Sequence, residues 1–437
     1  MRKRLIESFL FLFILVLFLS SCSKGAPSVI LDADANPIAD VSDTIELYDE
    51  AFSAYAKYST SEAVQILSDI YECGDDEALK MLQENGLKIY TAAIPLQISA
   101  AKDVHSQLCY DAPLSIAVTD SQARLTMIYS SSGDITSSFA GSAIKPLSIY
   151  APCIEKGIMN WSSMQTDSPV KKLSDEEGGD LWPSNSNGIY TEKNVTAASA
   201  LSQSLNTVAV RWLKEYGVEN SMDFLEDSFG MNLQRERSIY ALTSEEEILA
   251  NIALGYLQNG VNVCDMAGYY RIFNDKGNYT PTFTIEKIED ADGKVIYTAK
   301  AEKKQVVSEE TAWIINRMLK DVIDNGTGKK ADIRGEYIVG KTGTTDDYSD
   351  NWFVGVMPQN TVAVWHGKKS SNIAAEIFAG FVPEAKISSN GNFTPCESVV
   401  QKIFCPESGL LVSGKCSGIE MGYYKSTDSI TQCDSHQ

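Results

Sequence analysis

Residues 141–146 read Gly-Ser-Ala-Ile-Lys-Pro, and this stretch decides which fold to expect. Ser142 and Lys145 stand three positions apart, so on a helix their side chains project from nearly the same face. We expect Ser142 to begin a helix that runs to about Gly157. Pro152 falls inside this helix, where a proline usually kinks the axis.

A serine and a lysine at this spacing suit acyl transfer. A serine hydroxyl is a poor nucleophile at neutral pH and needs a positioned base to take its proton. A buried lysine near other cationic groups has a lowered pKa and can serve as that base. Ser142 is therefore the candidate nucleophile, and Lys145 is the candidate base.

Two further short motifs follow in order: residues 204–206 read Ser-Leu-Asn, and residues 341–343 read Lys-Thr-Gly. Each motif is weak by itself, but the three together in helix, loop and strand contexts are specific. We predict that Ser204 relays a proton to the leaving amine. Asn206 is expected to position the substrate amide.

The third motif is expected to bind substrate along a strand. Lys341 would attract the substrate carboxylate and hold the second motif in a polar network, and Thr342 lies beside it. Gly343 has no side chain, which lets the substrate lie against the strand. The amides of Ser142 and Thr344 are expected to form an oxyanion hole, because the start of a helix offers free N–H groups. We expect no metal and no cofactor in this site.

A Ser-His-Asp triad is the obvious rival for a serine enzyme. The chain has three histidines, His105, His366 and His436, and no Gly-x-Ser-x-Gly motif surrounds a serine. His366 falls at a predicted strand end with no acidic partner in any motif. We interpret it as a packed or surface histidine.

Predicted strands flank a long helical insert. This arrangement implies an α+β domain whose sheet is mostly antiparallel, with a cleft between the sheet and the helices. The expected strands are 113–120, 124–129, 337–342, 351–356 and 361–366, with a hairpin over 283–299, a helix over 309–324, and a helix that is capped by Ser244 and Glu247 and ends near Asn259.

The residues around the three motifs resemble the signatures of bifunctional, high-molecular-weight penicillin-binding proteins. The matching stretches are Gly-Ser-Ala-Ile-Lys-Pro at 141–146, Gln-Ser-Leu-Asn-Thr at 203–207 and Gly-Lys-Thr-Gly-Thr-Thr at 340–345. Residues 86–91 resemble the strand that opens their transpeptidase region, and residues 350–355 resemble the strand after their third motif. The resemblance implies a β-lactamase/transpeptidase-like fold, with helices on both sides of the sheet.

The resemblance also implies a function. A D,D-transpeptidase of this family forms an acyl intermediate, here on Ser142, with a peptidoglycan stem peptide that ends in D-Ala-D-Ala, and it binds β-lactams covalently. The alternatives are a D,D-carboxypeptidase or β-lactamase, or a non-catalytic sensor or scaffold for β-lactams or muropeptides. Residues 23–85 are too few for a glycosyltransferase domain, so a separate glycan polymerase is a candidate partner. Ala140 stands where many relatives have a proline, which bears on substrate preference.

The N-terminus has the pattern of a bacterial lipoprotein signal. Residues 1–4 are basic, residues 9–19 are apolar, and Ser-Ser-Cys22 follows. The apolar run is too short for a membrane span. We expect cleavage before Cys22, lipidation of its side chain, and attachment to the outer face of the cell membrane. An uncleaved signal anchor is the alternative, and both place residues 23–437 outside the cytoplasm.

The formal net charge of −21 makes nucleic acid an unlikely partner. We divide the chain into a signal peptide (1–22), a linker and helical stalk (23–84), a transpeptidase domain (85–384) and a cysteine-containing tail (385–437). Within the stalk, residues 23–44 are the predicted linker.

The tail contains Cys396, Cys405, Cys416 and Cys433. Disulfides are expected there, in an oxidising exterior, with the pairing left open. The rival interpretation is a zinc knuckle. We disfavour it because the tail has no Cys-x-x-Cys pair and because His436 lies outside the familiar ligand spacings.

Overall fold

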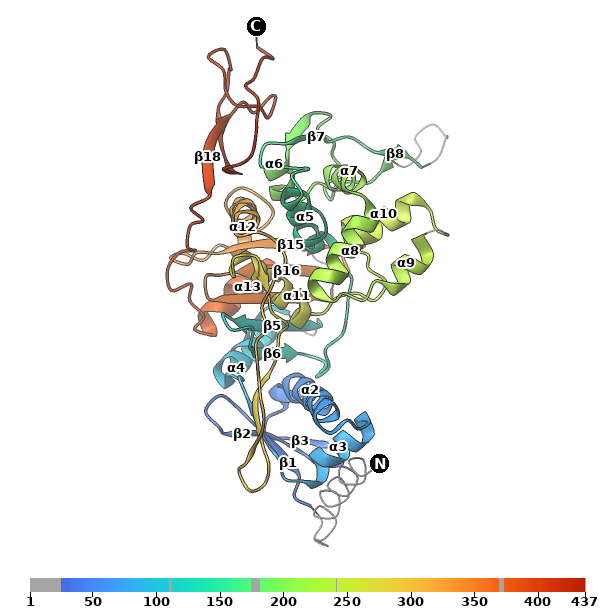
Figure 1. Cartoon of the computed structure of the whole chain (residues 1–437), viewed down its shortest axis with the longest axis vertical. Helices are drawn as coiled ribbons and strands as arrows, with labels where there is room; N and C mark the ends of the chain where they lie inside the picture. The colour runs from blue at the N-terminus through green and yellow to red at the C-terminus, as the bar shows by residue number, and fades with distance from the viewer. Residues whose placement is uncertain (1–24, 110–111, 174–180, 241, 369–372, 437) are drawn as a thin grey trace, which may run out of the picture.

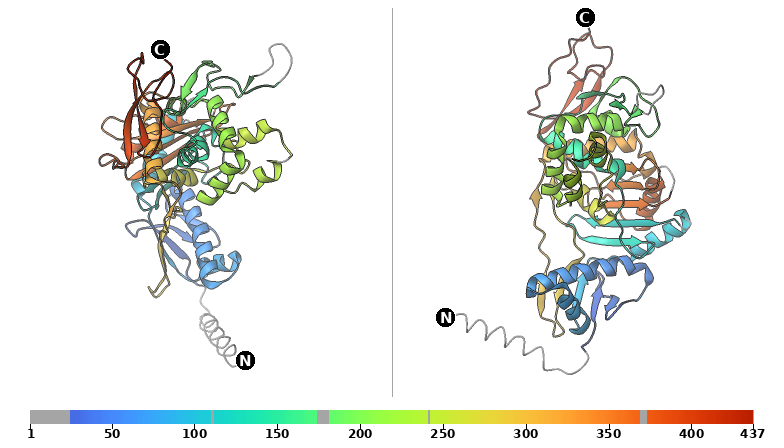
Figure 2. Two further views of the ribbon diagram at one scale, coloured as in Figure 1. Left: turned by 45° about the horizontal axis from the view of Figure 1, so that its top comes forward. Right: turned by 90° about the vertical axis from the view of Figure 1, so that its right-hand side faces the viewer.

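The computed structural model describes residues 25–109, 112–173, 181–240, 242–368 and 373–436. These residues form an elongated molecule with the N-terminal domain at one end and the C-terminal tail at the other (Figures 1 and 2). None of the helices in these ranges has the length and apolar composition of a membrane span. The predicted signal peptide and Cys22 lie outside the described residues.

An antiparallel sheet occupies the middle of the molecule, in the strand order β15-β16-β17-β5-β6 (Figure 1). Its strands agree closely with the expected ones. They are β5 (Leu114–Asp120), β6 (Leu125–Ser130), β15 (Val339–Thr344), β16 (Asn351–Val356) and β17 (Asn360–His366). The edge strand β15 carries the Lys-Thr-Gly motif.

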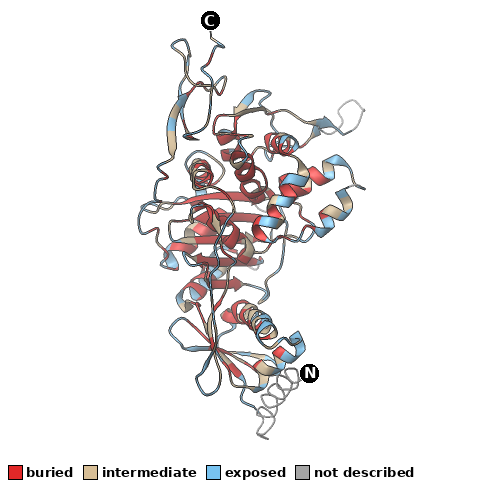
Figure 3. Ribbon diagram, in the orientation of Figure 1, coloured by how far each residue is buried: buried red, intermediate tan, exposed pale blue. Residues whose placement is uncertain are grey.

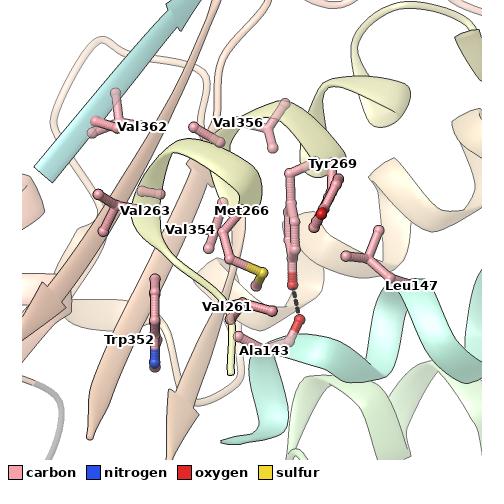
Figure 4. Close-up of a cluster of buried hydrophobic side chains, with 14 of the residues drawn as sticks. Ala143, Leu147, Val261, Val263, Met266, Tyr269, Trp352, Val354, Val356 and Val362 are labelled. Atoms are coloured by element: carbon pink, nitrogen blue, oxygen red, sulfur yellow. Dashed lines mark hydrogen bonds between the residues drawn. The ribbon is translucent and has the colours of Figure 1, made fainter. Parts of the chain in front are cut away.

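Helices cover both faces of this sheet, which explains why its strands are buried along most of their length. Figure 4 shows Val354 and Val356 of β16 on the side where Met266 of α11 (Val263–Tyr270) packs. Successive residues of a strand point to opposite faces. Phe353 accordingly points the other way, and its ring centre lies 4.8 Å from that of Phe378 in α13 (Ile373–Glu384). The predicted α+β fold with helices on both sides is confirmed.

Most helices of the insert between β6 and β15 lie beside the sheet (Figure 1), whereas α11 and α12 (Glu309–Asp324) of the same insert pack against it. The Ser244 hydroxyl accepts a hydrogen bond from the Glu247 amide, as the capping pattern predicted. That helix ends at Leu254 rather than near Asn259, because Gly255 adopts a left-handed conformation that closes it. The helices are α5 (Ala151–Glu155), α6 (Ala197–Ser202), α7 (Asn206–Tyr216), α8 (Val218–Phe229), α9 (Gln234–Tyr240) and α10 (Glu245–Leu254), followed after β14 by α12.

Short strand pairs complete the insert. They are β7 (Met164–Thr166) with β10 (Asn194–Thr196), β8 (Lys171–Lys172) with β9 (Leu181–Trp182), and β11 (Asn278–Tyr279) with β14 (Lys304–Gln305).

The N-terminal region is a folded domain, so the prediction of a linker over residues 23–44 is wrong. Its sheet has the strand order β13-β12-β4-β1-β2-β3. The apolar stretches of β1 and β2 are buried because β1 pairs with β4, which in turn pairs with the hairpin β12–β13 from far along the chain. The elements are β1 (Ser28–Leu31), β2 (Pro37–Val41), β3 (Ile45–Leu47), α2 (Ser53–Tyr71), α3 (Asp75–Glu84), β4 (Lys88–Thr91), α4 (Pro95–Val104), β12 (Ile285–Glu289) and β13 (Val295–Thr298).

The tail forms a two-stranded unit, β18 (Val399–Phe404) paired with β19 (Glu420–Lys425), beside α12. Figure 3 shows buried residues concentrated in the central sheet and the helices next to it, with fewer in the tail.

Candidate active site

The helical run that carries Ser142 is irregular. It begins as a 3₁₀ turn (Gly141–Ile144), widens to a π turn (Pro146–Tyr150) and ends as α5, so the expected regular helix to Gly157 needs correction. Prolines supply no backbone N–H, and Pro152 leaves the Ser148 carbonyl without its regular α-helical donor. The Ser221 hydroxyl donates to that carbonyl at 2.6 Å. A side chain from α8 therefore replaces the missing hydrogen bond.

The Ser142 turn is fixed in the protein core. Ala143 and Leu147 belong with Val261 and Met266 to one buried cluster (Figure 4). The hydroxyl of buried Tyr270 donates to the Ala143 carbonyl, the dashed line that ends on Ala143 in Figure 4. This hydrogen bond therefore holds the backbone next to Ser142 from the side of α11.

Two glycines let this turn lie directly against β15. Gly141 has a φ of +54°, and a Cβ added there would lie 2.8 Å from both the N and the O of Thr344. A Cβ on Gly343 would lie 2.4 Å from the Ala140 carbonyl oxygen. Larger residues do not fit at either position. The backbones of Ser142 and Thr344 are therefore neighbours.

The two amides expected to form an oxyanion hole are both unused by regular hydrogen bonding. The Thr345 amide donates to the Asp350 carbonyl at 3.1 Å, on the β16 side. Alternation along a strand then points the Thr344 amide toward the free edge of β15. The Ser142 amide lies in the first turn of its helical run, where no preceding carbonyl is available to accept it.

The loop between α6 and α7 brings the second motif to the same place. Lys145 Nζ donates to the Ser204 carbonyl at 2.8 Å and to Asn206 Oδ1 at 2.6 Å. Lys341 Nζ donates to Ser204 Oγ at 2.8 Å and to the Thr342 carbonyl at 2.9 Å. Ser204 has a φ of +58°, which turns its backbone and hydroxyl toward the two amines. The three motifs thus share one hydrogen-bond network.

Both amines are fully buried, with exposed fractions of 0%. Burial lowers the pKa of Lys145 well below its ordinary value of 10.5, and the nearby charge of Lys341 lowers it further, against a smaller opposing effect of Asp346. Burial lowers the pKa of Lys341 to about 7. An amine with a lowered pKa holds a free lone pair near neutral pH, as a base requires.

Ser142 itself is half-buried, and so is Thr344 on the facing strand. Among the described residues, Ser142 Oγ makes no hydrogen bond, and Lys145 Nζ is directed to the second motif rather than to Ser142. The Thr342 hydroxyl, by contrast, is already paired with that of Thr327 at 2.6 Å.

The structure adds a support that sequence reasoning missed. Asp167, fully buried, accepts hydrogen bonds from the Thr207 hydroxyl at 2.7 Å, the Asn185 amide group at 2.7 Å and the Thr191 backbone at 2.9 Å. Burial alone raises the pKa of Asp167, but these hydrogen bonds outweigh it and lower the pKa. Asn185 also accepts from the Asn206 amide at 2.8 Å. Thr207 follows the second motif directly, and its position there was the one sequence feature that could have indicated this support.

The structure gives no support for a histidine base. His105 is hydrogen-bonded to Tyr129 and Ala112, and His436 contacts Cys405 in the tail. His366 is buried at the end of β17. In the described ranges, no hydrogen bond joins a histidine to Ser142, and the site has no cluster of potential metal ligands.

Comparison with known proteins gives a consistent result. Residues 115–381 match the model of the penicillin binding protein transpeptidase domain. Penicillin-binding protein 4 of Bacillus subtilis is 30% identical over 356 residues, which are 74% of this chain and 54% of that protein. The chain spans about half the length, or less, of the curated relatives it matches.

Solved structures show the same fold. Penicillin-binding protein 1A from Haemophilus influenzae has a TM-score of 0.70 at 15% identity, covering 94% of this chain and 99% of that chain. The PonA1 protein from Mycobacterium tuberculosis in complex with penicillin V has a TM-score of 0.62 at 20% identity, covering 77% and 94%. At these identities the likeness concerns the fold.

Proposed function

The chain belongs to the family of penicillin-binding protein transpeptidase domains, and on this premise we propose that it is a serine D,D-transpeptidase that cross-links peptidoglycan stem peptides. The observation that carries the proposal is the pair of buried amines, Lys145 and Lys341, that tie Ser204 and Asn206 to the turn of Ser142. Burial of two amines in one network costs folding free energy, and perturbed groups of this kind concentrate at functional sites.

The first half-reaction is acylation of the enzyme. The stem peptide lies along the free edge of β15, with its terminal carboxylate toward Lys341. Lys145 accepts the Ser142 proton as Oγ attacks the carbonyl carbon of the penultimate D-alanine. The negative charge on the carbonyl oxygen forms between the amides of Ser142 and Thr344, an arrangement whose donors each contribute about 10²–10³ in rate.

Departure of the leaving group completes this half-reaction. The C–N bond to the terminal D-alanine breaks as Ser204, hydrogen-bonded to Lys341, passes a proton to the leaving amine. Free D-alanine departs, and the acyl group remains on Ser142. In the second half-reaction, an amine from a neighbouring stem peptide attacks the ester carbonyl and loses a proton, the C–O bond to Ser142 breaks, and Oγ regains a proton as the serine hydroxyl. A separate glycan polymerase would supply the strands.

β-Lactams enter the same site in this proposal. Their strained amide replaces the D-Ala-D-Ala bond, and ring opening leaves a penicilloyl ester on Ser142. The related fold of PonA1 has been solved in complex with penicillin V. Deacylation by water needs a base beside the ester. Among the described residues, no carboxylate is hydrogen-bonded to Ser142, Lys145 or Asn206, which favours a long-lived acyl-enzyme over β-lactamase turnover.

The test uses a fluorescent penicillin and intact-mass measurement on the purified chain. We expect one adduct per chain, located on Ser142 by peptide mapping, and a single burst of β-lactam consumption without turnover. Ser142→Ala should abolish labelling, while Ser137→Ala, at an exposed serine upstream, should label normally. Equal labelling of the Ser142 variant refutes the assignment. Sustained hydrolysis of excess β-lactam would instead make the protein a β-lactamase.

Transpeptidation is tested separately from penicillin binding. With a pentapeptide donor and an added amine acceptor, a transpeptidase releases D-alanine and forms the cross-linked product. Release of D-alanine with hydrolysed donor alone would indicate a carboxypeptidase. Labelling by penicillin without D-alanine release under either condition would indicate a sensor.

We also propose that the chain is held at the outer face of the cell membrane through lipid on Cys22. The support is the basic start, short apolar run and cysteine at residues 1–22. Stable attachment takes two lipid chains. Cys22→Ser should leave an unprocessed precursor or release the protein from the membrane fraction. Unchanged size and partition would favour a retained signal anchor.

A further inference from the structure

The tail gathers a set of side chains that the transpeptidase chemistry does not use. The ligand atoms of Cys405, Cys416, Cys433 and His436 all lie within 4.8 Å of one another. We propose that these four residues form a structural zinc site. The disfavoured zinc knuckle thus becomes the better interpretation of the tail, because folding brings together residues that are far apart in the sequence.

The distances suit a tetrahedral ion. With Zn–S of about 2.3 Å and Zn–N of about 2.0–2.1 Å, the ligand atoms of a tetrahedral zinc are roughly 3.5–3.8 Å apart. Cys405 Sγ and His436 Nε2 are 3.1 Å apart and share a hydrogen bond. An ion replaces that bond with a small lengthening and draws the other pairs slightly closer. Three cysteines and one histidine are a familiar ligand set for structural zinc.

The backbone of the tail holds the ligands in place. The Cys405 amide donates to the Leu410 carbonyl at 2.7 Å, and the Cys433 amide donates to the Leu411 carbonyl at 2.7 Å. The Gly409 amide closes a turn on the Cys405 carbonyl at 2.8 Å. One short segment therefore positions cysteines that are 28 residues apart in the numbering, 405 and 433.

Hydrogen-bond donors already surround the sulfur atoms. The Ser408 hydroxyl donates to Cys433 Sγ at 3.1 Å, and the Ser413 amide donates to Cys416 Sγ at 3.3 Å. Donors of this kind support metal-bound thiolates and orient them. Binding of the ion to three thiols and a neutral imidazole would release three protons and leave the site with a net charge of −1.

A disulfide accounts for the cluster less well. One disulfide among three gathered thiols leaves the third cysteine and the histidine unexplained, whereas zinc uses all four groups. The fourth cysteine of the tail, Cys396, stands outside the cluster and contacts the Ser398 hydroxyl at 3.3 Å. Only two residues separate Cys433 from His436, a proximity that the sequence interpretation did not weigh.

The tail has a physical need for such a link. Over residues 397–436, the fully or nearly buried apolar side chains are Phe404, Cys405, Tyr424 and Cys433. A β unit with so small a core usually requires a disulfide or a metal for stability. The Cys405–Gly409 loop also rests on the transpeptidase domain, where the Ser162 hydroxyl donates to the Gly409 carbonyl at 2.5 Å. Zinc would therefore fix the tail against the segment that follows α5.

The test uses the full chain, purified under reducing conditions without chelator and incubated with zinc before desalting. We expect one tightly bound zinc per chain by elemental mass spectrometry. Cobalt substitution should give thiolate-to-metal charge-transfer bands and the intense visible bands of a tetrahedral site. Cys416→Ser and His436→Ala should lose the metal, while Cys396→Ser, the matched cysteine outside the cluster, should retain it.

The wild-type cobalt spectrum keeps the test decisive even where a variant misfolds. Absence of bound zinc together with an octahedral cobalt spectrum would overturn the proposal. So would a disulfide within the cluster in protein isolated from its own cells and alkylated before any reduction. Removal of zinc by a chelator should lower the melting temperature of the wild type and leave Cys416→Ser unchanged. None of these readouts depends on the transpeptidase activity, so failure of one proposal leaves the other intact.

Discussion

The contact between the Ser142 turn and β15 depends on Gly141, and Gly141→Ala tests it. The alanine Cβ would lie 2.8 Å from the N and O of Thr344 and 2.9 Å from its carbonyl carbon. These are backbone atoms of a paired strand, so they cannot rotate away as a flexible side chain can. The turn must therefore move away from the strand, and the Ser142 amide moves with it.

The expected magnitude has a structural part and a catalytic part. A non-glycine residue at a φ of +54° costs about 1–2 kcal/mol. Displacement of packed backbone adds about 1–3 kcal/mol, as for other overpacked sites. Separation of the Ser142 and Thr344 amides removes one effective donor from the oxyanion, which lowers the acylation rate about 10²–10³-fold.

Gly157→Ala is the matched control. Gly157 has a φ of +68°, and nothing lies within 4 Å of a Cβ added there. Gly157→Ala should therefore lose stability from the unfavourable backbone conformation alone, without a steric clash. The assay is the second-order rate constant of penicillin acylation, together with the free energy of unfolding in urea. Acylation of Gly141→Ala at the wild-type rate, or an equal loss of acylation in Gly157→Ala, would refute the reasoning.

Two further predictions concern buried polar groups near the site. Asp167→Asn replaces the carboxylate with an amide group, part of which faces hydrogen-bond donors. Because hydrogen bonds to charged groups contribute about 1.5–3 kcal/mol each, we expect a loss of about 2–5 kcal/mol in unfolding free energy and slower acylation. Thr207→Ser keeps the hydroxyl and should acylate normally, and a normal acylation rate for Asp167→Asn would contradict a positioning role. Lys341 has a pKa of about 7 in the folded protein against an ordinary 10.5. Between these values the unfolded chain binds more protons than the folded one, so stability should rise with pH across this window. Urea unfolding of wild type and Lys341→Met measures the difference, and equal pH slopes would contradict the shift.

Much of the fold was predictable because its signals are local. The strand Asn351–Val356 and the helix Glu309–Asp324 have the predicted bounds, since each is a continuous run closed by turn or capping residues. The hairpin around Asp292 and Gly293 was also predicted correctly. The linker prediction failed because residues 28–41 form a local pair of strands, β1 and β2, which joins a larger sheet only where β1 pairs with β4 farther along the chain.

The sequence by itself determined which residues make up the candidate site. Ser142, Lys145, Ser204, Asn206 and Lys341 were all named from motif order and residue type, and the structure brings them to one place. Their proposed roles stay predictions until the variants are measured. Residue types and short spacings carry this information because acyl transfer requires particular functional groups close to one another.

Only the tertiary structure decided how those groups are held and what else lies near them. The approach of Gly141 and Gly343, the support of Thr207 by Asp167, and the cluster of Cys405 with Cys416, Cys433 and His436 all join segments distant in the chain. Such contacts have no local pattern, because a hydrogen bond or a metal ligand set depends on distance in space and on burial. Packing of the whole core sets both.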